Sequence, residues 1–547
     1  MFKLPGIFDA KPDHPMSDIK EARRLLAELP YDNTFKALDE ITSWLTSVKE
    51  TPGFRPDLRA AIIMLLDETG QPLHAELLLL YLGEPHLQDF KGKLLWQGIH
   101  GHMKALADAY AACAEEYQKA EKKSFDSKAI IPVIFVRLLR AIAERIKLEL
   151  MRYAVVEQST WVQLFNSYSL AEANQLADTM VYAYPGNVIH ISPQRELLRA
   201  MMLYVASPGT LAPDQIEVSY RITGRLVNFF DFKAAPDPDC TYFIDLSEPG
   251  APARVDNDLQ ASPAMRFFGA ARALPALEKI IDQNERSLIR QEQRFGNEFT
   301  PEGKLTVLKH LHMYWGKERQ RRHQERRDIS ATIEVVHSFR TISKLVTHMD
   351  LGNMVNLSEK EAATFKEMSE INLAADEDVD YTTEAWTISD LSSGGVGGVL
   401  PSTAGKWVKI GDLCGIKAKN SQLWWIGLIR RLRTDQKGAV HVGIEIIAKN
   451  PLSVWLRILG KGAEKVSNWE SSSGSFKYDY LPVILLPGLD DSYANAKMLM
   501  ESGRYVPDTI YQVMMGEKSR DIKLTGLLEE GEDFERVSFQ WLDPARV

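Results

Sequence analysis

The feature that most constrains the fold of this chain is a change of hydrophobic period near residue 327. Before it, apolar residues recur three or four positions apart, as at Leu38, Ile41 and Leu45, which is the period of an amphipathic helix. After it, apolar and polar residues alternate, as in residues 329–335 (ISATIEV), which is the period of a half-buried strand. We therefore expect a multidomain α+β protein with an all-α N-terminal half followed by β-rich structure.

The helical half divides into two predicted regions, residues 1–155 and residues 156–300. Helices are predicted at residues 17–29, 33–48, 55–68, 72–82, 87–123 and 127–155 of the first region. The second region has shorter helices and a proline-rich segment that predicts a β-hairpin near residues 241–255. Trp161, Leu164 and Tyr168 match part of a tetratricopeptide helix, but no copy recurs at that repeat's spacing of about 34 residues. An ordinary helix with three core residues is the better interpretation.

The strand-like segments after residue 327 predict a small antiparallel barrel. They lie at residues 329–335, 386–389, 407–410, 413–417, 424–431 and 440–447, separated by Gly and Asp turns. With a lead-in helix, this barrel is assigned to residues 301–449. Residues 340–384 are interpreted as an insertion after the first strand, with a helix at residues 358–368 and an acidic tail. Residues 450–547 predict a small β-rich C-terminal domain.

Composition and charge exclude several classes of protein. A chain of 547 residues with 45% hydrophobic and 25% charged residues is neither disordered throughout nor collagen-like, and it predicts about three to four domains. The formal net charge of −9 argues against a protein that binds long nucleic acids. The longest apolar runs have about eight residues, whereas a membrane span needs about 20. The N-terminus, MFKLPGIFDAKPDHP, lacks the apolar core of a secretory signal.

The three cysteines, Cys113, Cys240 and Cys414, lie far apart and form no CxxC pair. This pattern argues against a disulfide framework or a zinc ribbon and favours a reducing compartment. We therefore expect a cytoplasmic protein.

A basic motif precedes the first predicted barrel strand. Residues 320–326 read QRRHQER and contain Arg321, Arg322 and Arg326. Arginine binds phosphate oxygens with two hydrogen bonds, pairs with the O6 and N7 atoms of guanine and stacks on bases. Residues 317–327 carry six basic and two acidic side chains, so their local charge of +4 suits a small anionic ligand. Alone, such a run is most often a solvated surface at a helix end.

A second motif, DLSSGG at residues 390–395, follows on a predicted hairpin. The carboxylate of Asp390 suits the N1–H and N2–H donors of guanine, and the Ser392 hydroxyl adds an adjustable polar contact. Gly395 permits a tight turn with exposed backbone N–H groups. Alone, this motif is typical of a plain turn.

Together and in this order, the motifs resemble the (Q/E)RRxxxR and DxSxxG motifs of PilZ domains, the bacterial receptors of cyclic di-GMP. The segments WVKIGDLCGIK and HVGIEII also resemble later strands of that family, and the resemblance covers about residues 319–448. It implies a PilZ-like barrel in which three arginines contact phosphates and guanine Hoogsteen edges, while the second motif contacts the other guanine edge. The implied ligand-binding residues are Arg321, Arg322, Arg326, Asp390, Ser392 and Gly395.

The spacing of the two motifs departs from the family, because 63 residues lie between Arg326 and Asp390 where a few tens are usual. The insertion at residues 340–384 accounts for the excess if it leaves the barrel between two strands. It could instead cover the site with acidic side chains and exclude an anionic ligand.

The resemblance implies a non-enzymatic effector that binds cyclic di-GMP and reorients a helical output region, which would contact a downstream protein. No metal or other cofactor is expected, because His310, His312 and His323 lack the Cys or acidic partners of a metal site. The GGDEF and EAL signatures of enzymes that make and degrade cyclic di-GMP do not occur in the sequence. Two alternatives stay open. One is a partner-binding scaffold whose degenerate barrel no longer binds ligand; the other is an enzyme in the helical half, where the sequence reveals no convergent ionisable groups.

Overall fold

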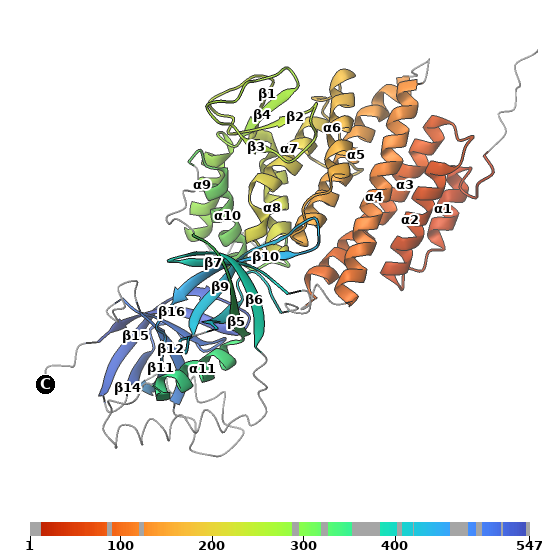
Figure 1. Cartoon of the computed structure of the whole chain (residues 1–547). Coiled ribbons are helices and arrows are strands. Elements are labelled where there is room, and N and C mark those ends of the chain that lie inside the picture. The colour runs from red at the N-terminus through yellow and green to blue at the C-terminus, as the bar shows by residue number, and fades with distance from the viewer. Residues whose placement is uncertain are drawn as a thin grey trace, which may run out of the picture. The chain divides into compact units, whose positions relative to one another are not determined.

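The computed structural model describes residues 12–84, 90–119, 125–286, 295–318, 327–352, 383–401, 407–419, 421–459, 480–487, 495–515 and 518–542. The chain forms two compact units, Met1–Arg321 and Arg322–Val547 (Figure 1). The first is largely helical and the second largely β-stranded, which confirms the predicted α+β class. The border lies close to the position where the hydrophobic period changes.

The first unit packs its helices around one apolar core. The helices are α1 (Ile19–Ala27), α2 (Thr34–Glu50), α3 (Pro56–Leu82), α4 (Phe90–Lys119), α5 (Phe125–Met151), α6 (Gln158–Ala173), α7 (Pro193–Val205) and α8 (Pro213–Leu226). Asn33 caps α2, because its side chain accepts a hydrogen bond from the Lys36 N–H (3.0 Å). Leu38, Ile41 and Leu45 of α2 are buried, as their spacing predicts.

The predicted break at Gly70 is wrong, because α3 continues through Gly70 and Pro72. Glycine and proline inside a helix cost about 1 and 3 kcal/mol relative to alanine. Packing offsets this cost: α3 contacts α1, α2 and α4 and buries residues along its whole length. At Gly70 a side chain would come within 3.0 Å of the His102 ring on α4, so the glycine allows the two helices to approach closely.

After α8 the chain forms a four-stranded antiparallel sheet in the order β1-β4-β2-β3. Its strands are β1 (Asp231–Lys233), β2 (Tyr242–Asp245), β3 (Ala253–Arg254) and β4 (Met265–Gly269). The helices α9 (Ala273–Arg286) and α10 (Pro301–Trp315) follow, and the Thr300 hydroxyl caps α10 by accepting from the Gly303 N–H (3.1 Å). Trp315 is buried and its Nε1–H donates to the Met202 carbonyl (3.1 Å), so α10 belongs to the helical core.

The second unit begins with a closed antiparallel barrel, as predicted. Its strands are β5 (Arg327–His337), β6 (Glu384–Ser392), β7 (Gly395–Val399), β8 (Leu413–Ala418), β9 (Trp425–Thr434) and β10 (Val440–Ala448), in the order β10-β7-β6-β5-β8-β9. The predicted strand at residues 407–410 is wrong, because this segment forms a turn. The Trp407 ring there stacks on His337 and Trp386 at centroid distances of 4.6 and 5.7 Å, so its apolar character serves packing.

A second closed barrel follows where a small β-rich domain is predicted. It consists of β11 (Leu452–Leu459), β12 (Tyr480–Leu486), β13 (Lys497–Glu501), β14 (Ile510–Met515), β15 (Lys518–Glu530) and β16 (Phe534–Trp541). The strand order is β11-β12-β13-β16-β15-β14, and every pairing is antiparallel. Barrel closure removes the unpaired strand edges that an open sheet would expose.

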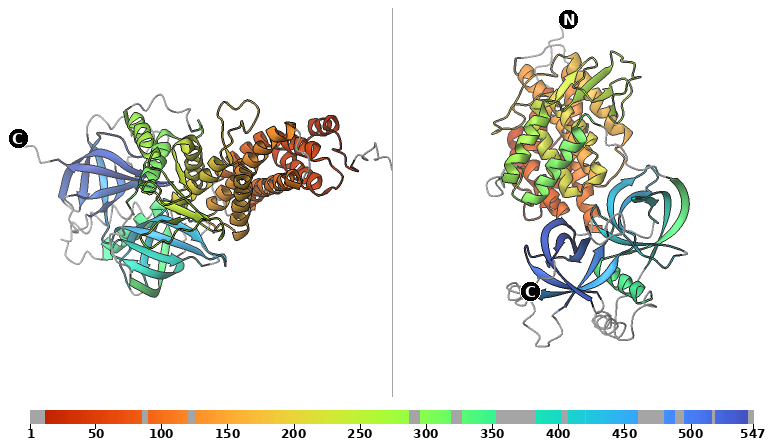
Figure 2. Two further views of the ribbon diagram at one scale, coloured as in Figure 1. Left: turned by 90° about the horizontal axis from the view of Figure 1, so that it is seen from above. Right: turned by 90° about the vertical axis from the view of Figure 1, so that its left-hand side faces the viewer.

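Helix α11 (Phe339–Gly352) occupies the start of the predicted insertion and packs against both barrels; Figure 2 gives two further views of the β-stranded unit. It contacts β5 and β8 of the first barrel and β11, β12 and β13 of the second. Phe339, Ile342 and Val346 are buried in an apolar cluster that both barrels share. This part of the predicted insertion is therefore a core element that joins the barrels. The predicted helix at residues 358–368 and the acidic tail lie outside the described residues.

An acidic group between the barrels predicts a pH dependence of stability. Burial and the nearby Glu532 and Asp533 raise the pKa of Asp412 from 3.8 to about 7, although the carboxylate accepts from the Lys409 N–H (2.9 Å). From about pH 4 to 7 the folded protein therefore binds more protons than the unfolded chain, and stability present at low pH is lost as the pH rises through 7.

Replacing Asp412 by asparagine should remove this loss, because the amide oxygen can still accept from Lys409. We expect the free energy of unfolding to increase by on the order of 1–2 kcal/mol near pH 8 and to change little near pH 4. Urea unfolding at both pH values measures the difference. An equal change in the free energy of unfolding at pH 4 and pH 8 would show that the effect of the substitution does not come from ionisation of Asp412.

Candidate ligand-binding site

A cleft of about 530 Å³ lies on the outer face of the first barrel, across β6, β7, β9 and β10. Along β10 the side chains of Val442 and Ile444 are buried, whereas His441 and Glu445 are exposed, which identifies the outer face. The volume is within the usual range of small-molecule sites. The lining residues are Ser389, Asp390, Ser392, Gly394, Gly395, Gly397, Gly398, Arg430, Arg431, Arg433, His441, Val442, Gly443, Ile444 and Glu445.

The strand register places four of these residues in one row across the cleft. Asp390 of β6 pairs with Gly397 of β7, Gly397 pairs with Gly443 of β10, and Gly443 pairs with Arg431 of β9. Adjacent strands lie about 4.8 Å apart, so roughly 14 Å of sheet separates the acid from the arginine. Gly397 and Gly443 carry no side chains of their own, and they lie between Asp390 and Arg431. The row therefore has a negative and a positive side chain at its ends.

The Asp390 carboxylate lies directly over Gly397. A Cβ atom added to Gly397 would overlap both carboxylate oxygens, so only glycine fits beneath this side chain. The Ser389 hydroxyl contacts Asp390 Oδ2 (3.4 Å) and the Gly397 carbonyl oxygen (3.3 Å). The sequence pattern assigned no role to Gly397, because a requirement of this kind depends on the neighbouring strand.

Ser392 and Gly395 close the hairpin between β6 and β7. The Ser392 hydroxyl donates to the Gly395 carbonyl oxygen (3.3 Å), and Ser393 and Gly394 form the turn. A Cβ atom on Gly395 would come within 3.0 Å of the Ile444 carbonyl oxygen. Gly395 therefore allows β10 to approach this hairpin closely.

Three arginines of β9 supply positive charge that the sequence motifs did not predict. Arg431 and Arg433 are exposed on the same face of the strand, and within the described residues neither has an ion-pair partner. Arg430 is held by Glu445 of β10 (Nε to Oε2, 2.6 Å) and by Glu529 of the second barrel. The sequence RRLR contains the signal that could have predicted these residues, because Arg431 and Arg433 alternate with an apolar residue. This pattern is, however, typical of any exposed strand face.

The structure brings Asp390, Ser392 and Gly395 together at one cleft. The other three predicted residues, Arg321, Arg322 and Arg326, lie outside the described residues. The described chain resumes at Arg327, the first residue of β5, which pairs with Leu391 of the DLSSGG motif.

The helical unit contains convergent ionisable side chains that the sequence did not reveal. Lys147 is 1% exposed and its Nζ contacts Glu144 (2.5 Å) and Glu217 (2.6 Å). Despite burial, the ion pair with Lys147 keeps the pKa of Glu144 low, at about 2. Because opposite charges satisfy each other inside the core, this arrangement is typical of structural ion pairing.

A metal site or a membrane span has no support in the part of the chain that the structure describes. There, no three His, Cys, Asp or Glu side chains come together as metal ligands. Among the described helices, none has both the length and the apolar character required to cross a bilayer. The three cysteines are buried and free, and burial raises the pKa of the Cys113 thiol to about 12.

Comparison with known families yields two matches. The model of the N-terminal domain of the cyclic-di-GMP receptor FimW matches residues 20–237, within the helical unit. The model of the middle PilZ domain of the same receptor matches residues 339–451, which include β6–β10. That range contains Asp390, Ser392 and Gly395 and begins after Arg326. No curated protein matches the chain.

Proposed function

Because the chain belongs to the FimW family of cyclic-di-GMP receptors, we propose that it is a non-enzymatic effector that binds cyclic di-GMP in the barrel cleft. The observation that carries this proposal is the row of Asp390, Gly397, Gly443 and Arg431. It combines an acceptor for guanine N–H groups with a cation for a phosphate, and two glycines without side chains lie between them.

Each end of the row has a distinct chemical role. The Asp390 carboxylate accepts hydrogen bonds from N1–H and N2–H of one guanine, and the Ser392 hydroxyl adds a polar contact beside it. Arg431 and Arg433 neutralise phosphate oxygens at the opposite end. Adenine has no N1–H and no N2 amino group, so the same carboxylate discriminates against cyclic di-AMP.

The arginine motif completes this site in the proposal. The motif that contains Arg321, Arg322 and Arg326 ends immediately before Arg327. Arg327 pairs with β6, the strand that carries Asp390. From this sequence position, the motif contributes phosphate contacts and guanine Hoogsteen contacts. The support is the resemblance of QRRHQER to the family motif together with this register.

We place the output in the helical unit. The arginine motif lies between α10, which ends at Trp315, and β5, which begins at Arg327. Contacts between this segment and the ligand would reorient the helical unit if the two orientations of that unit differ in ligand affinity. A downstream protein would then recognise the new orientation of the helical unit. The buried, free cysteines support the expected cytoplasmic location of this signalling.

Calorimetric titration with cyclic di-GMP tests the proposal, with cyclic di-AMP as the matched control ligand. The wild type should release heat and melt at a higher temperature with cyclic di-GMP, and it should do neither with cyclic di-AMP. Arg322→Ala should weaken binding at least about tenfold, because a charge-assisted contact is lost. Neither heat nor a melting shift in the wild type would favour the alternative, a partner-binding scaffold with a degenerate barrel.

A further inference from the structure

Arg430 connects the ligand cleft to the second barrel. It lies at a β-bulge, because Arg431 pairs with Gly443 and Ile429 pairs with Ile444, which leaves Arg430 without an opposite residue. A bulge redirects the side chain of the extra residue. Arg430 lines the cleft, and its guanidinium also reaches Glu529 of β15 in the second barrel.

Carboxylates occupy the hydrogen-bonding edges of the Arg430 guanidinium. Its Nε–H donates to Glu445 Oε2 (2.6 Å), and its two terminal nitrogens donate to the two oxygens of Glu529, one of them at 2.9 Å. Glu529 is itself paired with Arg536 of β16 (3.2 Å). Charges of alternating sign therefore run from the cleft into the second barrel.

This pairing determines what Arg430 can offer a ligand. Its N–H edges are bound to carboxylates, but the two faces of the planar cation are free of those hydrogen bonds, and the side chain is 36% exposed. Arginine faces stack on nucleobases. A long side chain held by Glu445 alone would rotate about that single contact, whereas the bidentate contact with Glu529 fixes the plane of the guanidinium.

We infer that Glu529 is a positioning residue of the ligand site. It acts from the second barrel and holds Arg430 in the orientation that stacks on a purine base of the ligand. The inference rests on the proposed function, and it assigns a role to the C-terminal barrel. Because coupling between two sites is reciprocal, the bound ligand must in turn strengthen the contact between the barrels.

The decisive experiment measures the cyclic di-GMP affinity of two single variants of the full chain, of the double variant that combines them, and of one control variant. Glu529→Gln keeps the size of the side chain but loses the bidentate contact, and Arg430→Lys keeps the charge but loses the planar face. Each should weaken binding about tenfold. The double variant should bind about as weakly as either single variant, because both changes disable one element.

Glu532→Gln is the matched control. Glu532 also links the barrels, through Lys409 (2.6 Å), but Lys409 does not line the cleft. This variant removes the same charge from the same hairpin of the second barrel, so its affinity should stay within about twofold of the wild type.

Hydrogen exchange of the backbone amides distinguishes a positioning role of Glu529 from a purely structural one, because only the positioning role links ligand binding to β15. Cyclic di-GMP should slow exchange of β15 backbone amides in the wild type and in Glu532→Gln, and should do so less in Glu529→Gln. Wild-type affinity in a folded Glu529→Gln variant, or equal losses in Glu529→Gln and Glu532→Gln, would overturn the positioning role alone. A wild type that binds no cyclic di-GMP would overturn the proposed function as well.

Discussion

Replacing Asp390 by alanine is expected to weaken the binding of cyclic di-GMP about a hundredfold without unfolding the barrel. Its carboxylate is assigned two charge-assisted hydrogen bonds from one guanine, and each such bond contributes about 1.5–3 kcal/mol. Loss of both leaves two guanine donors without a partner when the base is bound. Isothermal titration calorimetry measures the change in affinity, and thermal unfolding without ligand checks that the fold is retained.

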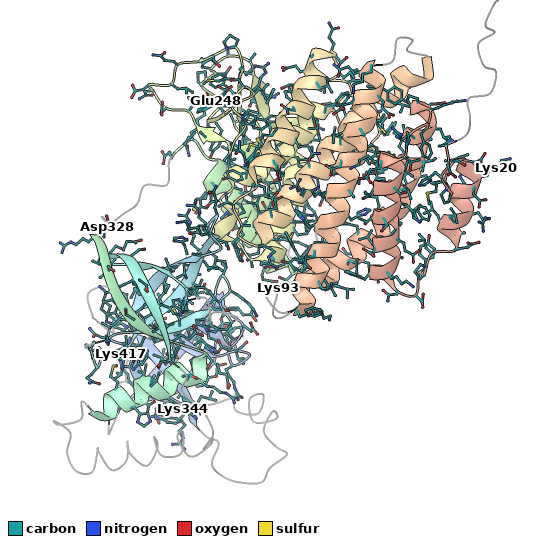
Figure 3. The ribbon with its side chains drawn as sticks, turned by 45° about the vertical axis from the view of Figure 1, so that its right-hand side comes forward. Lys20, Lys93, Glu248, Asp328, Lys344 and Lys417 are labelled. Carbon is teal, nitrogen blue, oxygen red and sulfur yellow. The ribbon has the colours of Figure 1, made fainter. Side chains whose placement is uncertain are left out.

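Asp328 provides a matched control for this substitution. It pairs directly with Asp390 on the adjacent strand, is exposed and does not line the cleft; Figure 3 shows it at the beginning of β5. Asp328→Ala removes the same charge from the same region, so its affinity should equal or slightly exceed that of the wild type. An equal loss in both variants would indicate a general charge effect, and an unchanged Asp390→Ala would place the guanine contact elsewhere.

Replacing Gly397 by alanine should reduce binding about as strongly as loss of the Asp390 carboxylate and should also destabilise the barrel. The new methyl group would occupy the position of that carboxylate and force it away from the cleft floor. Overpacking of this kind costs about 1–3 kcal/mol of stability. Calorimetry measures the affinity, and urea unfolding measures the stability.

A double-mutant cycle identifies the origin of this effect. In an Asp390→Ala background the carboxylate is gone, so Gly397→Ala should destabilise the barrel much less than it does in the wild type. Equal destabilisation in both backgrounds would show that the methyl group conflicts with a part of the barrel other than Asp390.

The local elements that sequence patterns predicted well are those decided by neighbouring residues. Period-3.6 and period-2 patterns identified the helical half and the strands, and the Thr300 cap correctly located the start of α10. DLSSGG placed Asp390 and Ser392 on one hairpin, because the two residues are close in sequence. The family resemblance followed from such local patterns and is confirmed by the matches to FimW.

The errors occurred where long-range packing outweighs local preference. Gly70 and Pro72 signal a helix end, but burial of α3 against three other helices keeps it continuous. The apolar segment at Trp407 resembles a strand, but its ring stacks on residues of β5 and β6 instead. The predicted insertion at residues 340–384 overlaps α11, which belongs to the core that both barrels share.

The change of hydrophobic period thus determined the classes of structure along this chain, and the DLSSGG motif identified Asp390, Ser392 and Gly395, which line the candidate site. Which further residues share that site depends on barrel closure. Arg431 reaches the row of Asp390 only through the register of four strands, and Glu529 meets Arg430 across 99 residues of sequence. Strand pairing over such separations leaves no local pattern, because it depends on the cooperative packing of the whole barrel.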